Sequence, residues 1–267
     1  MSARDPGLAF TDGALQFEAW SDNLWDPMGR DVVQAARLLP GEKVLDACCG
    51  TGAATIPAAL AVGPDGTVDG VDLSTGLLRI AAANLAERRI LNTTLTEADV
   101  TQWRGHRTFD AVLCSYSMFF FADMESGVEH LASMLRPGGR LVTSTWIEGA
   151  LEPFAGLILE AAIKERPRLA GVVPLANQNM AKIDSAESLT SWLAARGLAD
   201  VEVSTHPLTL TVDDAMAWDL VMGSGWRTLL PRDPDAIARV RRDFVKSIGP
   251  QVAMNSDALI GIGTVPA

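Results

Sequence analysis

The stretch that most constrains this chain is residues 41–52, where a short apolar run meets a turn of small residues. The run 43–48 has the nearly continuous apolar character of a strand that is buried on both faces. Gly50 and Gly52 let the backbone turn where a side chain would block an approaching ligand. Asp46 precedes this turn, at the edge where open α/β sheets bind ligands. We interpret the stretch as a cofactor-binding strand–turn–helix, although a Gly-x-Gly pair alone also occurs in ordinary turns.

Composition narrows the class of protein. The chain has 267 residues, of which 48% are hydrophobic and 21% charged, as in globular proteins with one large core or a core plus a smaller cap. A disordered chain is excluded. The net charge of −11 argues against nucleic-acid or anionic-membrane partners, because both require clustered Lys and Arg.

The three cysteines, Cys48, Cys49 and Cys114, lie inside apolar strand-like runs. This pattern favours a reducing compartment over a disulfide framework or a zinc site. The N-terminus lacks the apolar region of a signal peptide, and no apolar stretch is long enough to span a membrane. We expect a soluble, cytoplasmic protein that binds no metal.

Aromatic residues recur at roughly helical spacing in residues 1–40: Phe10, Phe17, Trp20 and Trp25. The segment 26–29, Asp-Pro-Met-Gly, predicts a turn before a second amphipathic helix. Such an aromatic stripe is typical of packing against a core. Because it precedes the cofactor strand, it can also form a lid over the site.

Strand and helix patterns alternate from residue 41 to residue 146, which predicts a parallel sheet wound on both faces. Ser74 and Asp123 are expected to cap two of the intervening helices, and 137–139, Pro-Gly-Gly, is expected to end the second. The predicted strands are 43–48, 67–72, 93–98, 109–115 and 140–146.

The predicted strand ends form an informative set. Asp46, Asp72, Asp99 and Ser115 each lie at or just after the carboxyl end of one strand. Right-handed crossovers bring these ends to one edge of the sheet. Asp72 follows the glycine turn by about 20 residues, the spacing of an acid that binds ribose hydroxyls.

Together these motifs resemble those of class I S-adenosylmethionine-dependent methyltransferases, especially the ubiquinone and menaquinone biosynthesis enzymes and bacterial natural-product methyltransferases. The resemblance covers about residues 40–146 and implies an α/β, doubly wound, seven-stranded and mostly parallel sheet. Its last strand would be antiparallel, which places the sixth strand at 200–206 and the seventh at 258–265. The motifs that carry it are Val44-Leu45-Asp46, Cys49-Gly50-Thr51-Gly52, Gly70-Val71-Asp72-Leu73-Ser74, Ala98-Asp99-Val100, Phe109-Asp110-Ala111-Val112 and Leu135-Arg136-Pro137-Gly138-Gly139.

The resemblance also implies a role for each cofactor-binding residue. Cys49, Gly50 and Gly52 would border the methionine part of S-adenosylmethionine, and Asp46 would reach its ammonium directly or through water. The remaining residues would hold the ribose (Asp72), pack on the adenine (Leu73), contact its edge (Asp99 and Val100) and offer backbone near the methionine part (Ser115). The chain departs from the family pattern at Cys48, where a glycine is usual, and we expect the loop to tolerate the small cysteine.

Methyl transfer from a sulfonium requires mainly placement of the acceptor, so the sequence names no catalytic base. Tyr116, which follows the fourth predicted strand, is the weak candidate for a catalytic residue. His106, His130 and His206 receive no catalytic role.

Beyond residue 146 the periodicity changes. A helix is predicted over 186–197, and two apolar insertions, 147–184 and 207–256, could cap an acceptor pocket or form a subunit interface. Trp218, Met222 and Trp226 would share one helical face only if the helix continues through two glycines. The predicted acceptor-binding residues are Trp20, Trp25, Tyr116, Phe119, Trp146 and Trp226.

We therefore expect one compact domain with a helical lid over 1–40, a cofactor-binding core over 41–146, and 147–267 carrying the remaining strands and cap insertions. The predicted activity is methyl transfer from S-adenosylmethionine to oxygen, nitrogen or carbon of a small, apolar, aromatic metabolite of the secondary-metabolite or quinone-like type, yielding S-adenosylhomocysteine. A homodimer is compatible with the sequence. The alternative is a cofactor-binding protein of the same fold without methyl transfer, such as a cyclase or regulatory module. A nicotinamide dehydrogenase is a weaker alternative, since Thr55 stands where its fingerprint has a third glycine.

Overall fold

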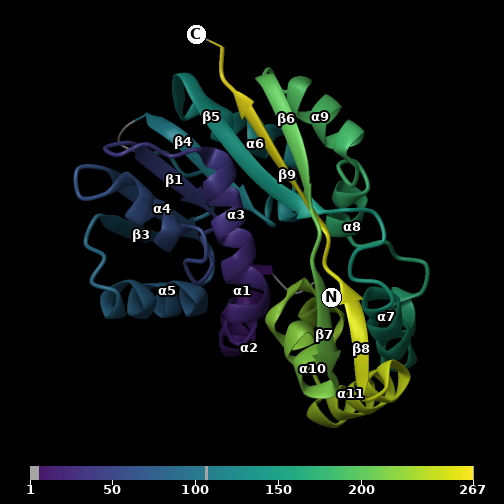
Figure 1. The fold of residues 1–267 in the computed structure, drawn as a ribbon. Coiled ribbons are helices and arrows are strands. Elements are labelled where there is room, and N and C mark those ends of the chain that lie inside the picture. Colours follow the sequence, from purple (N-terminus) through teal and green to yellow (C-terminus); the bar gives the residue numbers. More distant parts are fainter. Residues whose placement is uncertain (1–5, 106–107, 267) are drawn as a thin grey trace.

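A computed structural model describes residues 6–105 and 108–266 and contains a seven-stranded sheet in the order β3-β2-β1-β4-β5-β9-β6 (Figure 1). Only β9 runs antiparallel to its two neighbours, β5 and β6. This arrangement confirms the predicted fold class. The strands are β1 (Lys43–Ala47), β2 (Thr67–Asp72), β3 (Thr93–Glu97), β4 (Phe109–Ser115), β5 (Leu135–Trp146), β6 (Ala199–His206) and β9 (Ala258–Thr264).

Most strand boundaries match the prediction within a residue, but the start predicted for the fifth strand is wrong. Helix α6 (Met124–Ser133) ends before the Pro-Gly-Gly segment, and β5 already begins at Leu135. Leu135 pairs with Phe109, and a register shift between Phe109 and Ala111 accommodates the glycines within the strand. The turn residues therefore produce an irregularity in β5 and do not end the preceding helix.

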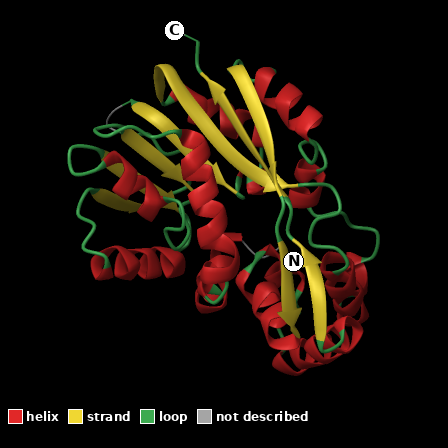
Figure 2. Ribbon diagram, in the orientation of Figure 1, coloured by secondary structure: helices red, strands yellow, loops and turns green. Residues whose placement is uncertain are grey.

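Two apolar layers enclose the sheet, because successive strand residues point to opposite faces. Helices α3 (Asp26–Ala36) and α4 (Thr55–Val62) pack on the face that carries Val44, and Figure 2 shows α3 crossing in front of the strands. Leu45 belongs to the other layer, together with residues of α6 and α9 (Ala186–Ala194). This alternation explains why the strands read as continuous apolar runs.

The N-terminal helices α1 (Pro6–Asp12) and α2 (Ala14–Glu18) lie between α5 (Thr75–Glu87) and α10 (Asp214–Gly223) (Figure 1). Glycines permit this close approach, since a Cβ on Gly223 would lie 2.4 Å from the Phe17 nitrogen and one on Gly76 would lie 2.6 Å from the Thr11 carbonyl oxygen. A π-helical turn (Ser21–Trp25) then leads directly into α3. The turn predicted at 26–29 is wrong, because Pro27 lies in the first turn of α3, where its missing N–H costs nothing.

A second lobe follows β5 and contains two strands that sequence reasoning missed, β7 (Thr209–Asp213) and β8 (Gln251–Asn255). Its helices pack around Phe154, Trp218 and Phe244. They are α7 (Phe154–Glu165), α10 and α11 (Pro234–Ile248), with short 3-10 turns at Pro167–Leu169 and Gly225–Leu229. Helix α8 (Leu175–Met180) also follows β5 but packs on the 3-10 turn Met118–Phe120, which precedes β5.

The helix expected to join Trp218 to Trp226 does not persist. Helix α10 ends at Gly223, and Trp226 lies in the separate 3-10 turn Gly225–Leu229. Across residues 6–105 and 108–266, every helix is too short or too polar to cross a membrane.

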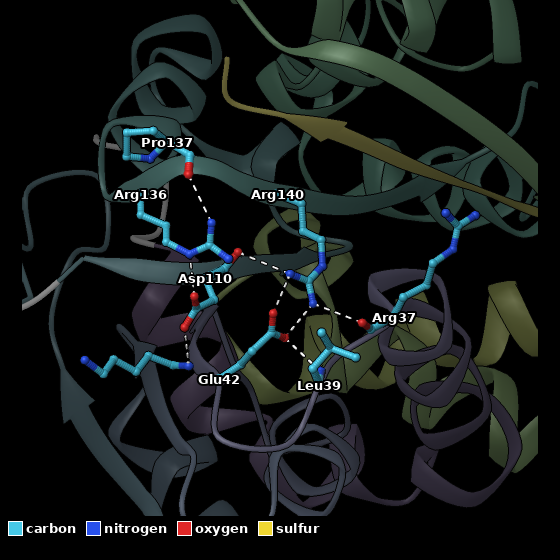
Figure 3. A network of polar contacts seen from close by, with 8 residues as sticks. Arg37, Leu39, Glu42, Asp110, Arg136, Pro137 and Arg140 are labelled. Atoms are coloured by element: carbon cyan, nitrogen blue, oxygen red, sulfur yellow. Dashed lines mark hydrogen bonds and ion pairs between the residues drawn. The ribbon is translucent and has the colours of Figure 1, made fainter. Parts of the chain in front are cut away.

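A polar network fastens the edge of the sheet at which β1 and β4 begin (Figure 3). The largely buried side chains of Arg140 and Glu42 form an ion pair, with Nη2 and Oε2 2.6 Å apart, and Arg140 also donates to the carbonyl oxygens of Arg37 and Ala36. Asp110 accepts from Arg136 Nε at 2.5 Å and from the Lys43 N–H at 2.8 Å. The amino-terminal edge is thus cross-linked, while the functional residues lie at the opposite edge.

Candidate active site

The turn after β1 adopts the backbone that a close ligand contact requires. Gly50 has φ of +56° and Gly52 has φ of +96°, a region that L side chains rarely occupy. Cys48 also has positive φ, +61°, so it takes the left-handed conformation that the family pattern assigns to glycine. The turn therefore forms with a cysteine here, at a strain of about 1–2 kcal/mol.

Asp46 lies beneath this turn and is only 1% exposed. The Thr55 hydroxyl, at the start of α4, donates to its Oδ2 at 2.5 Å. Burial, with the charge of Asp72 as a further contribution, raises the pKa of Asp46 to about 7. The contact between Thr55 and Asp46 was not predicted from the sequence, because Thr55 was considered there only as the residue that replaces the third glycine of a dinucleotide-binding fingerprint.

Asp72 joins the glycine turn to β2. Its Oδ2 accepts from the Gly50 N–H at 2.9 Å and its Oδ1 accepts from the Ser74 N–H at 2.8 Å. Burial raises the pKa of Asp72, although these backbone hydrogen bonds act in the opposite direction. Each oxygen keeps a further lone pair with which to accept a ligand hydroxyl.

The two acids and the glycine turn form a site whose polar groups fit S-adenosylmethionine. Asp46 and Asp72 are two buried carboxylates, and the hydrogen bonds of the described chain give neither of them a Lys, Arg or His partner. Buried anions are normally paired with positive charge. The sulfonium and ammonium groups of the cofactor supply positive charge, its ribose supplies hydroxyls, and the turn of Gly50 and Gly52 leaves backbone accessible.

The residues predicted for the adenine lie at the ends of β2 and β3. Leu73 is 53% exposed and available to a flat ring, whereas Val100 is buried. Asp99 is exposed, and its Oδ1 accepts from the Thr101 N–H at 2.9 Å and hydroxyl at 2.7 Å. Their contacts with adenine stay predictions.

Two further predicted cofactor residues are tied into the sheet. Cys49 is buried against Gly70, and its N–H donates to the Val71 carbonyl at 3.1 Å, so neither its thiol nor its N–H faces the turn. Ser115 Oγ lies 3.1 Å from Ser144 Oγ, which leaves the Ser115 backbone as the part predicted to face the methionine group.

A row of aromatic rings extends from the glycine turn to the end of β5. Phe17 lies over the turn, 3.6 Å from where a Gly50 Cβ would be, and stacks on Trp25 with ring centroids 4.7 Å apart. Trp25 contacts Tyr116 edge-on at 6.3 Å, and Tyr116 lies 4.3 Å from Trp146. We call Phe17, Trp25, Tyr116 and Trp146 the aromatic row. Three of its members were predicted, and Phe17 was detectable from the same helical spacing but was not selected.

The other predicted acceptor-binding residues lie elsewhere. Trp20 is 1% exposed and its indole N–H donates to the Met216 carbonyl at 3.1 Å, so in this conformation it is a core residue that offers no surface to an acceptor. Phe119 is buried and packs against Phe120. Trp226 is half-buried, outside the ring contacts of the aromatic row.

The histidines make local contacts. His130 Nε2 lies 2.7 Å from the Trp103 carbonyl oxygen. His206 Nδ1 lies 3.1 Å from Asp31 Oδ2, which links β6 to α3. His106 lies outside the described residues.

Comparison with known proteins accords with this site. The model of a methyltransferase domain matches residues 44–139. Aklanonic acid methyltransferase DauC of Streptomyces sp. (strain C5) is 31% identical over 74% of this chain and 93% of its own length. Nocamycin O-methyltransferase of Saccharothrix syringae is 27% identical over 87% of this chain and 86% of its own.

Solved structures share the fold at lower identity. A putative methyltransferase from Bacillus halodurans superposes with a TM-score of 0.58 and 17% identity over 89% of this chain and 98% of that one. The [4+2]-cyclase SpnF superposes with a TM-score of 0.56 and 17% identity over 91% of this chain and 81% of that one.

The glycine turn, the buried acids and these relatives define an S-adenosylmethionine-dependent enzyme. The chain belongs to the class I S-adenosylmethionine-dependent methyltransferases.

Proposed function

We propose that the acceptor is a small, largely apolar aromatic metabolite that is methylated on oxygen, nitrogen or carbon. The observation that carries this proposal is the aromatic row, which starts over the glycine turn and offers ring faces and edges near the expected methyl group. Aromatic rings favour offset or edge contacts with other rings, so the row suits a planar acceptor. The names of the two relatives, an aklanonic acid and a nocamycin methyltransferase, support a natural-product acceptor.

The chain contributes placement more than proton chemistry. When bound, S-adenosylmethionine would supply an activated methyl group that passes to an electron pair of the acceptor, with the electrons of the broken methyl–sulfur bond staying on sulfur and the proton lost by the acceptor passing to solvent. Asp46 and Asp72 would hold the cofactor from below, while Phe17 and Trp25 would shield the site from water. Such orientation contributes of order 7–11 kcal/mol in favourable systems.

The test combines binding with turnover. Calorimetry with S-adenosylmethionine and S-adenosylhomocysteine, with NAD as the negative control, measures cofactor binding. Release of S-adenosylhomocysteine is then followed with a panel of hydroxylated naphthalenes and anthraquinones. We expect turnover with several of these arenes. Methylation of only a protein or a nucleic acid would refute the acceptor class, and cofactor binding without turnover on any acceptor would favour the alternative without methyl transfer.

A further inference from the structure

Tyr116 is held at the centre of the aromatic row by an unusual backbone. It is the first residue after β4, and its φ of +49° lies in the left-handed region, which is costly for a bulky side chain. Its N–H donates to both the carbonyl oxygen and the hydroxyl of Ser144, at 3.2 and 3.1 Å. These bonds fix the direction of the ring between Trp25 and Trp146.

The phenol oxygen of Tyr116 is buried and has no hydrogen-bond partner among residues 6–105 and 108–266. The hydroxyl of Ser144 is close enough for a hydrogen-bonding interaction that acts to lower the pKa of the phenol, although the two groups do not meet the geometry of a formed hydrogen bond. That hydroxyl is already shared between Ser115 Oγ and the Tyr116 N–H, each at 3.1 Å. Tyrosine hydroxyls that are buried usually find a partner, because an unpaired polar group is destabilising.

The surroundings keep this phenol protonated. Burial, followed by the negative charge of Asp31, raises the pKa of Tyr116 well above its ordinary value. Asp31 itself is engaged by His206 Nδ1 at 3.1 Å. Tyr116 can therefore donate a hydrogen bond, but it is unsuited to take a proton from an acceptor.

We propose that the Tyr116 hydroxyl donates a hydrogen bond to an oxygen of the acceptor, and that the acceptor is a planar arene bearing a carbonyl or carboxylate oxygen. This inference rests on the proposed function and specifies its substrate class. The aromatic neighbours select a flat ring, and the unpartnered hydroxyl selects an oxygen that accepts its hydrogen bond.

The experiment compares wild type with Tyr116→Phe, which keeps the ring and removes only the hydroxyl. The matched control is Thr93→Val, because the Thr93 hydroxyl is likewise buried without a partner in the described chain but lies at the opposite, amino-terminal end of edge strand β3. Calorimetry in saturating S-adenosylhomocysteine measures binding of 3-hydroxy-2-naphthoate and of 2-naphthol, which lacks the carboxylate. Thermal unfolding measures stability without ligand.

We expect Tyr116→Phe to bind 3-hydroxy-2-naphthoate about tenfold more weakly, as befits the loss of one hydrogen bond to a charged oxygen. Its affinity for 2-naphthol and S-adenosylhomocysteine should be unchanged, and its melting temperature should not fall. Thr93→Val should bind all three compounds as wild type does.

Several results would overturn the inference. One is that Tyr116→Phe and wild type bind 3-hydroxy-2-naphthoate with equal affinity. Another is that the wild-type protein binds 3-hydroxy-2-naphthoate no more tightly than 2-naphthol, or binds neither compound. A lower melting temperature in Tyr116→Phe with unchanged naphthoate affinity would show that the hydroxyl has a structural partner. Failure of the wild-type protein to bind S-adenosylhomocysteine would refute the proposed function itself. The cofactor measurement therefore distinguishes failure of the proposed function from failure of the inference about Tyr116.

Discussion

Replacing Asp46 with asparagine should change how the stability of the protein depends on pH. The folded protein raises the pKa of this carboxyl from 3.8 to about 7, mainly by burial. The folded state therefore binds the proton more tightly than the unfolded state does. The resulting stabilisation is fully present below about pH 4 and is lost as the pH rises through 7.

The magnitude follows from the difference between the two pKa values. About three pKa units correspond to about 4 kcal/mol, of which about 2.5 kcal/mol is lost between pH 5 and pH 8. The asparagine of the Asp46→Asn variant cannot ionise, and its side-chain oxygen can still accept from Thr55. The free energy of unfolding of Asp46→Asn relative to wild type should thus rise by about 2.5 kcal/mol over this range.

Urea titrations at half-unit pH intervals, followed by tryptophan fluorescence, measure this difference directly. A second assay is calorimetry with S-adenosylmethionine. If the cofactor ammonium pairs with the Asp46 carboxylate, wild-type affinity should increase with pH by up to tenfold per unit below 7, with release of a proton. Asp46→Asn should lack this slope. Parallel stability curves for the two proteins, within about 0.5 kcal/mol, would show that burial does not perturb Asp46 and would refute the reasoning.

Three further changes test the remaining parts of the fold and site. Asp72→Ala should weaken S-adenosylmethionine binding by about 1–3 kcal/mol, because the ribose loses its acceptor, and an unchanged dissociation constant in calorimetry would remove that assignment. Gly52→Val should abolish detectable cofactor binding and also lower stability by about 1–3 kcal/mol, since its φ of +96° does not suit a β-branched residue; wild-type affinity would contradict a close approach of ligand to this turn. Glu42→Ala should cost about 3–5 kcal/mol in urea unfolding by leaving the Arg140 guanidinium buried without its partner, and a loss below about 1 kcal/mol would show that the pair is effectively solvated.

Much of the sheet was predictable because its information is local. A strand such as β1 is an apolar run followed by a turn, and right-handed crossovers place the carboxyl ends of the parallel strands at one edge of the sheet. The acids Asp46 and Asp72 were identified for the same reason. They end strands, and strand ends gather at one edge.

The features that sequence reasoning missed depend on distant contacts. Strands β7 and β8 pair over an intervening segment that contains two helices, so no short turn signals them. The approach of Phe17 to Gly50 depends on how α2 fits between α5 and α10, and Gly223 allows that fit from a distant part of the sequence. The Trp20 side chain, by contrast, is aromatic and well spaced but faces inward, which spacing alone could not reveal.

The part of the second lobe that lies between β6 and β9 in the chain joins the sheet through one pair of adjacent strands. Strands β6 and β9 continue into β7 and β8, so that His206 pairs with Ala258 and, just beyond, Thr209 pairs with Asn255. The Ser256 N–H donates to the Leu208 carbonyl at 2.7 Å, which links the two chain segments between the two ladders.

Both ends of the segment 209–255 therefore lie side by side, although they are far apart in the chain. Two crossovers made at this point would exchange β7, α10, α11 and β8 between homologous enzymes without cutting any strand of the seven-stranded sheet, whereas α7, which packs on α11, would stay with the sheet. An enzyme recombined in this way would keep the glycine turn, the two buried acids and the whole aromatic row, because all of these lie outside 209–255.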